Sequence, residues 1–155
     1  MLTSIRLVLV CTLLLIFAAC SQGLPAIPGA STPLVTIETR GGECIDGPCG
    51  SQVVIERDGT VRQLVPAEAE LGKLPPDALT ALDAAIKTAD FSAIRAVPFQ
   101  GECPVNFDGQ EFVYEFGAPG GVERIASCET AIDDAHPVFA ALTTAFAAVG
   151  VLPAG

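Results

Sequence analysis

The chain has 155 residues, half of them hydrophobic, and carries a net charge of −10 at pH 7. This length suits one domain with one apolar core. A chain with this negative charge repels phosphate backbones, and the sequence has no basic patch with interleaved aromatic residues. The composition therefore argues against nucleic acid as a partner. All 18 acidic residues follow Cys20, which indicates that contact with an anionic membrane runs through lipid and not through the face of the domain.

Residues 1–19 have the pattern of an export signal. Arg6 and the amino terminus provide positive charge, and an apolar run over 7–19 follows, interrupted only by Thr12. As a helix this run would reach about 20 Å, which is short of the ~30 Å hydrocarbon core of a bilayer. The leader is therefore predicted to be cleaved and not to remain as a transmembrane helix.

The leader ends in Phe17-Ala18-Ala19-Cys20, which resembles the lipobox of bacterial lipoproteins: an aliphatic residue, two small residues and a cysteine. Phe17 departs from the Leu that usually opens this pattern. The resemblance implies that Cys20 is lipidated, with palmitate or similar acyl chains, and that the protein is lipid-anchored in the bacterial cell envelope outside the cytoplasm. The alternative is an ordinary secretory signal, which would release a soluble protein.

Residues 20–33 are predicted to be the lipidated cysteine and a flexible tether, because prolines and glycines recur there without apolar periodicity. One globular domain is expected over 34–152. Alternating apolar and polar residues predict a strand over 34–40. Two more strands are expected over 52–57 and 60–65, joined by the turn signal Asp58-Gly59, and residues 67–73 are expected to be an irregular connection.

Two helices are expected in the second half of the domain. One begins near Pro76 with an apolar stripe that continues to about residue 89, followed by a short turn over 90–94, and the other covers 137–149. Between them lie an irregular loop over 98–109 and a hairpin of strands 111–116 and 122–128. On the first of these strands Phe112, Tyr114 and Phe116 share a face, where core packing is expected more than a ligand platform. The sequence therefore predicts an α+β fold: an antiparallel sheet of about five strands with two helices packed on one face.

Six cysteines occur, of which Cys11 would leave with the leader and Cys20 would carry lipid. The even number that remains in an exported chain indicates disulfides, and several connectivities are possible. Pairing between sequence neighbours is the simplest arrangement: Cys44 with Cys49 and Cys103 with Cys128. A zinc site with four thiolates is the alternative, but the Cys-x-x-Cys spacing typical of structural zinc is missing, and no metal or cofactor is predicted.

His136 is the only histidine and lies near Asp133 and Asp134. In a catalytic role it would be a general base oriented by one of these acids, and it would have to line a concave pocket. Its position directly before Pro137 is more typical of the entry to a helix. No nucleophile elbow, metalloprotease helix or phosphate-binding glycine loop occurs, so no catalytic residue is predicted.

The two loops that carry cysteines, 41–50 and 98–109, are the candidates for a contact surface. Both are rich in glycine and acidic residues, and a disulfide in each would hold it rigid, which lowers the entropy cost of binding a partner. The alternative is that the bridges only stabilise a small domain. The residues predicted to contact a partner are Gly42, Glu43, Ile45, Asp46, Glu102 and Asn106.

The segment Val-Thr-Ile-Glu-Thr-Arg-Gly-Gly over 35–42 resembles the first strand and Gly-Gly turn of emfourin-type domains, and residues 74–91 resemble their central helix. A hairpin and a terminal helix follow in the same order up to about residue 149. Emfourin-type domains include inhibitors of thermolysin-like metalloproteases, so the resemblance implies the order of elements and suggests an inhibitory function, without identifying an inhibitory residue. The four cysteines and the longer loop after the glycines depart from that pattern. These features are closer to uncharacterised bacterial lipoprotein domains with a Cys-loop-Cys beside a hairpin.

Three functions follow from the sequence. The first is a membrane-anchored, non-catalytic binding domain whose bridged loops contact an extracytoplasmic protein. The second is an inhibitor of thermolysin-like metalloproteases, in which the acidic loop 42–46 would approach the zinc ion of the enzyme. The third is an enzyme that uses His136.

Overall fold

The computed structural model describes residues 32–44 and 47–151. The expected leader, the expected lipidation site Cys20 and the expected tether up to residue 31 lie outside the described residues. So do two residues predicted to contact a partner, Ile45 and Asp46. No helix in the described part of the chain is long and apolar enough to cross a membrane.

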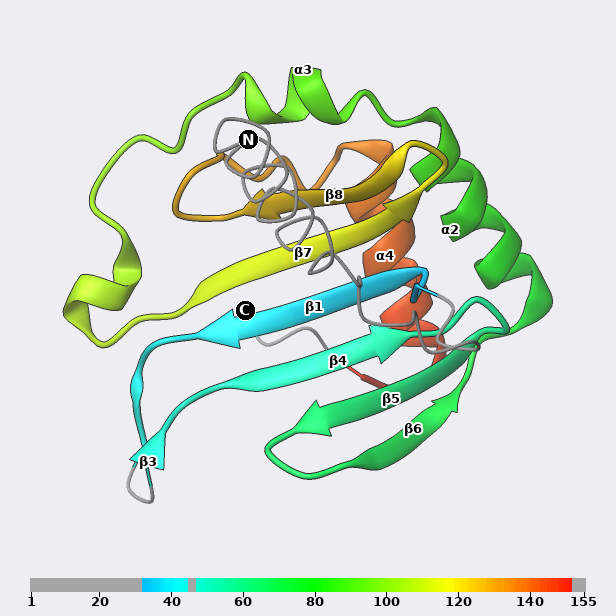
Figure 1. Ribbon diagram of the computed structural model, residues 1–155, viewed down its shortest axis with the longest axis horizontal. Coiled ribbons are helices and arrows are strands. Elements are labelled where there is room, and N and C mark those ends of the chain that lie inside the picture. The colour runs from blue at the N-terminus through cyan, green and yellow to red at the C-terminus, as the bar shows by residue number, and fades with distance from the viewer. Residues whose placement is uncertain (1–31, 45–46, 152–155) are drawn as a thin grey trace, which may run out of the picture. The chain divides into compact units, whose positions relative to one another are not determined.

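Among the described residues, six strands form one antiparallel sheet in the order β6-β5-β4-β1-β7-β8 (Figure 1). The strand β1 is central because it pairs with both β4 and β7: Val35 lies opposite Ile55 on one side and Phe116 on the other. Two very short strands, β2 and β3, pair with each other in the loop between β1 and β4. The bounds are β1 Val35–Arg40, β2 Glu43–Cys44, β3 Gly47–Pro48, β4 Ser51–Ile55, β5 Thr60–Val65, β6 Ala69–Lys73, β7 Glu111–Ala118 and β8 Gly121–Ala126.

The helices are α2 Pro76–Thr88, α3 Phe91–Arg95, the 3-10 helix η1 Pro104–Phe107 and α4 Pro137–Ala148. Both long helices begin with proline in the first turn, where its missing N–H would have no partner in the helix. The helices α2 and α4 pack together, and α4 crosses behind the strands in Figure 1. The predicted α+β fold, an antiparallel sheet with two helices on one face, is therefore confirmed.

The core lies between the sheet and the helices. Phe116 on β7 is fully buried, with its ring centroid 5.2 Å from that of Phe91 on α3 and 6.0 Å from that of Phe139 on α4. Tyr114 stacks beside Phe116 at 6.2 Å and also meets Phe139 edge-on at 5.3 Å. Core packing is thus confirmed for Phe116 and Tyr114, whereas Phe112 is half-buried, lies outside the core cluster and lines a small cavity.

The prediction of an irregular connection over 67–73 was wrong. Residues Ala69–Lys73 form the edge strand β6, which pairs with β5 and makes the sheet one strand wider than expected. An edge strand has one neighbour, and β6 is mostly exposed, so its sequence lacks the apolar alternation that identifies a strand. The register of β5 and β6 also shifts between Val61 and Arg62. The hairpin of β7 and β8 differs as well, because its strands reach Ala118 and Gly121 and leave a shorter turn than predicted.

Candidate functional site

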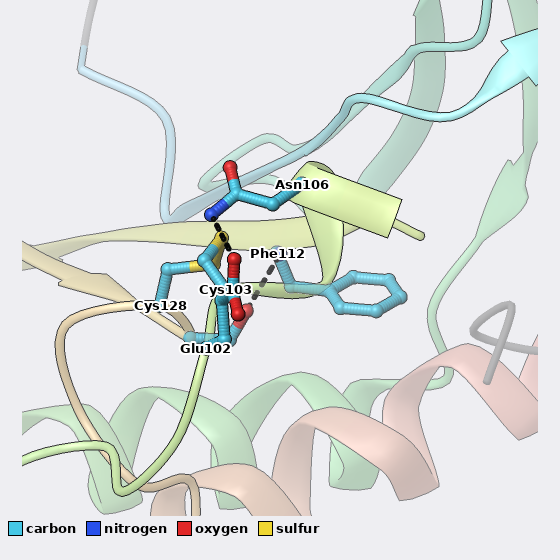
Figure 2. The surroundings of a disulfide bond; sticks show 6 residues. Glu102, Cys103, Asn106, Phe112 and Cys128 are labelled. Atoms are coloured by element: carbon cyan, nitrogen blue, oxygen red, sulfur yellow. Dashed lines mark hydrogen bonds between the residues drawn. A yellow bond between two sulfur atoms is a disulfide. The ribbon is translucent and has the colours of Figure 1, made fainter. Parts of the chain in front are cut away.

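Cys103 and Cys128 form a disulfide with their Cα atoms 5.1 Å apart, which confirms one of the predicted pairs (Figure 2). The bond ties the residue before η1 to the segment after β8. Cys49 is also disulfide-bonded. Its predicted partner Cys44 has a side chain outside those described, so that pairing stays a prediction. The alternative of a zinc site with four thiolates is wrong, because disulfide-bonded sulfurs are not thiolates.

The loop around η1 is fixed by its own backbone. The Asn106 N–H donates to the carbonyl of Cys103 at 3.0 Å, and the Gly109 N–H donates to the carbonyl of Pro104 at 2.8 Å. The side chain of Asn106 also donates to Oε1 of Glu102 at 3.2 Å (Figure 2). Gly109 has no room for a side chain, since a Cβ atom there would lie 2.6 Å from that of Pro104. The loop therefore has one tightly defined conformation.

The same loop is anchored to the sheet beside the disulfide. The Phe112 N–H donates to Oγ of Ser127 at 2.9 Å, and the Ser127 N–H donates back to the carbonyl of Phe112 at 2.9 Å. This reciprocal pair continues the hairpin of β7 and β8 up to Cys128. The disulfide consequently fastens η1 to a rigid end of the sheet.

The loops 41–50 and 98–109 lie against each other. Gly41 adopts a positive φ of 82°, and a Cβ atom there would lie 2.8 Å from Cγ2 of Val105 and 3.0 Å from the carbonyl oxygen of Gly109. A Cβ atom on Gly42 would lie 3.4 Å from the carbonyl oxygen of Asp108 and 3.5 Å from Sγ of Cys49. In Figure 1 both loops extend from the same end of the sheet. The absence of side chains at positions 41 and 42 allows this close approach.

We call residues 41–43 and 102–109 the paired-loop surface. Its apolar members are Phe107, which is 67% exposed, and Val105, which is 38% exposed. Glu43, Glu102 and Asp108 are exposed around them. No lysine or arginine occurs in the stretches 41–56 and 96–123. The surface thus presents an exposed aromatic ring and a branched apolar side chain among carboxylates.

Of the residues predicted to contact a partner, the structure brings Gly42, Glu43, Glu102 and Asn106 to this surface. Sequence reasoning missed Val105 and Phe107. A signal was available: two large apolar residues stand in a short loop that has neither strand alternation nor helical periodicity, so burial in the core was not expected for them.

Arg40 directly precedes the loop 41–50, and its side chain pairs with another residue of the same strand, β1. Its Nε and Nη2 atoms donate to the two carboxylate oxygens of Glu38, each at 2.8 Å. This hydrogen-bonded pair lowers the pKa of the Glu38 carboxyl and raises the pKa of Arg40. The cation at the end of β1 therefore has a fixed partner beside the paired-loop surface.

His136 lines a cavity, as the enzyme hypothesis required, but in the described part of the chain neither Asp133 nor Asp134 is hydrogen-bonded to its ring to orient it. The Val138 N–H donates to Nδ1 of His136 at 3.3 Å, so the ring caps α4. The carboxylate of Asp133 accepts from the Ala135 N–H at 3.0 Å and not from the ring. His136 therefore lines the cavity with its Nδ1 bound to the start of α4.

Comparison of the chain with models of known families, with curated proteins and with solved structures finds no match. The emfourin-type resemblance consequently stays an interpretation of the sequence segments that carry it. Within 32–44 and 47–151, no three His, Cys, Asp or Glu side chains are grouped as metal ligands would be.

Proposed function

We propose that this protein is a membrane-anchored, non-catalytic bacterial lipoprotein whose paired-loop surface binds an extracytoplasmic protein. The observation that carries the proposal is the close packing of Gly41 against Val105, which makes two distant loops into one continuous surface. Each loop alone would present a few side chains. Together they present an area on which a partner can make several contacts at once.

The rigidity of the surface supports a binding role. The Cys103–Cys128 disulfide and the backbone hydrogen bonds of η1 hold the exposed side chains before a partner arrives. Binding then orders few additional groups, which lowers its entropy cost. A fixed, exposed aromatic ring such as that of Phe107 is a typical anchor residue of protein interfaces.

The chemistry of the surface indicates the kind of partner. An apolar pocket would accept Phe107, and basic residues around that pocket would pair with Glu43, Glu102 and Asp108. Complementary charge of this kind mainly accelerates association and selects the partner, whereas the buried ring supplies affinity. We therefore expect binding whose association rate falls as salt concentration rises.

The export of the protein is supported by its disulfides, which form and persist in oxidising compartments such as the bacterial cell envelope. The anchor at Cys20 is argued from the leader pattern alone. Mass spectrometry of the intact protein from membranes tests it: we expect a mature chain that begins at Cys20 and carries acyl chains. An unmodified Cys20 would contradict the lipid anchor. The binding role of the paired-loop surface does not depend on that result.

Site-specific photo-crosslinking tests the binding proposal. A photoreactive residue at position 107, in the protein expressed in its native envelope, is expected to capture one polypeptide reproducibly. The matched control is position 122 on β8, where Val122 is also exposed but lies outside the paired-loop surface. Equal capture at both positions, or no capture at 107, would contradict the proposal.

Inhibition of a thermolysin-like metalloprotease is a specific form of this proposal, supported by the exposure of Glu43 within the surface. Stoichiometric protein should then abolish peptide hydrolysis by the enzyme. Cys49→Ala removes a disulfide from the loop 41–50 and should weaken inhibition. Full protease activity in the presence of excess protein would rule out inhibition of that enzyme without affecting the wider binding proposal.

A further inference from the structure

A cavity of about 360 Å³ lies away from the paired-loop surface, between α3, the segment 131–136 and the start of α4. Its apolar wall includes Ile94, Ile132 and Phe139, and its polar groups are Asp90, Asp133 and His136. The volume falls at the small end of the range of ligand sites in proteins. The cavity therefore has room for a small ligand with an apolar body.

The two carboxylates of the cavity are held in place. Oδ1 of Asp90 accepts from the Ser92 hydroxyl at 2.7 Å and from the Ala93 N–H at 2.9 Å, and these hydrogen bonds lower the pKa of Asp90. Oδ1 of Asp133 accepts from the Ala135 N–H at 3.0 Å. In both residues Oδ2 takes no part in these bonds. Both aspartates are solvent-exposed, so the cavity has two carboxylates on its open side, and Oδ2 of each can receive a donor.

The beginning of α4 has no free N–H groups that would attract an anion to the cavity. Pro137 has no N–H, and the Val138 N–H is bound by the ring of His136. The next two N–H groups, of Phe139 and Ala140, both donate to the carbonyl of His136. The donors that make other helix N-termini into anion sites are therefore occupied here.

We propose that this cavity binds a small molecule in which an ammonium group is joined to an apolar body. The ammonium group pairs with Asp90 and Asp133, and the apolar body packs on Ile94, Ile132 and Phe139. This site is separate from the paired-loop surface, so its test does not depend on the proposed function.

Three probes that share a phenylethyl body but differ in the charge of their polar group separate the contributions to binding. We would titrate the purified full chain, with its disulfides intact and at physiological salt, with 2-phenylethylamine, 2-phenylethanol and 3-phenylpropionate, and follow backbone amide signals by NMR. The amine should give saturable shifts at Ala93 and Ala131 in the millimolar range expected for so small a ligand. The alcohol should bind about fivefold more weakly, because it loses the pairing with both exposed carboxylates, and the acid should not bind.

Variants then assign the site. Asp90→Asn and Asp133→Asn keep an oxygen that can accept the backbone N–H while removing the charge. Each should weaken the amine about twofold without unfolding the protein, so that the two carboxylates together account for the difference between the amine and the alcohol. Asp134→Asn, whose side chain does not line this cavity, is the matched control and should bind the amine nearly as the wild type does. Ala93→Leu places an exposed helix residue into the cavity and should abolish binding.

The proposal is overturned if the alcohol or the acid binds as well as the amine. It is also overturned if neither carboxylate variant weakens the amine more than Asp134→Asn does, or if no saturable shift occurs at tens of millimolar. Retention of binding by Ala93→Leu would place any binding of the amine elsewhere on the protein.

Discussion

The body of the domain and its paired-loop surface are held together by different means. In the body, Val35, Ile55 and Phe116 are completely buried between the sheet and the helices. In η1 no residue is buried, and the loop depends on a disulfide, backbone hydrogen bonds and glycines at close approaches. Stability in the body therefore follows from buried apolar area, whereas the shape of the surface follows from a few local constraints. The surface can be distorted without unfolding the body.

Two phenylalanines give the sharpest contrast between these regions. Phe116→Ala should destabilise the protein by about 4 kcal/mol, because it leaves a cavity in the packed core, whereas exposed Phe107→Ala should change stability by no more than about 0.5 kcal/mol. Urea unfolding followed by circular dichroism measures both. Similar losses in the two variants would show that the division between body and surface is wrong.

Removal of the Cys103–Cys128 disulfide should cause the next largest loss in the free energy of unfolding. The bond closes a loop with a sequence separation of 25, and the loop-entropy model gives about 3.5 kcal/mol for its effect on the unfolded chain. We expect a Cys103→Ala/Cys128→Ala double variant to keep the sheet and helices but to unfold at lower urea concentration. An unchanged unfolding midpoint would mean that the bond contributes nothing to the stability of the body.

Two glycines test the close approach of the loops. Gly41→Ala combines a positive φ with a collision against Val105, so we expect a loss of roughly 1–2 kcal/mol and altered amide signals in the loop 98–109. Gly120→Ala is the matched control, because a Cβ atom there has nothing within 4 Å. Signals that change equally in both variants, or only near the substituted residue, would contradict the contact between the loops.

The smallest effect is expected from the titration of Tyr114, the only tyrosine of the chain. Burial, followed by the charge of Asp134, raises the pKa of its phenol. The folded protein therefore holds this proton to higher pH than the unfolded chain, and stability should fall as the pH rises through the ordinary tyrosine range. Ultraviolet absorbance of phenolate should show a higher midpoint in the folded protein than in guanidinium. Coincident midpoints would contradict the packing of Tyr114 against Phe139.

The sequence predicted those parts of the fold whose signals are local. The alternation of β1, the Asp58-Gly59 turn and the proline at the start of α4 each lie within a few residues of the element that they define. Strand β6 was missed because a mostly exposed edge strand has no apolar pattern. The approach of the loops could not be predicted, since it joins Gly41 to Val105 through the pairing of β1 with β7, which no short segment encodes.

The sequence also predicted only part of the candidate surface, namely the part that local signals identify. Cysteines and glycines identified both loops, and their acidic residues were expected at the surface. Val105 and Phe107 were missed because the contact residues were chosen by cysteine, glycine and acidic character, and an apolar residue in an irregular loop was not considered. Their exposure depends on η1 being held outside the core by Cys103 and by the hydrogen bonds that begin at Pro104.

The most direct test of the account is the affinity of the polypeptide captured at position 107 for wild-type protein, Phe107→Ala, Gly41→Ala and Gly120→Ala, all with intact disulfides. A surface made jointly by the two loops predicts at least about tenfold weaker binding by Phe107→Ala and by Gly41→Ala, since an anchor residue contributes about 2 kcal/mol or more, and unchanged binding by Gly120→Ala. Wild-type affinity in the Gly41→Ala variant would contradict the claim that the two loops form one binding surface.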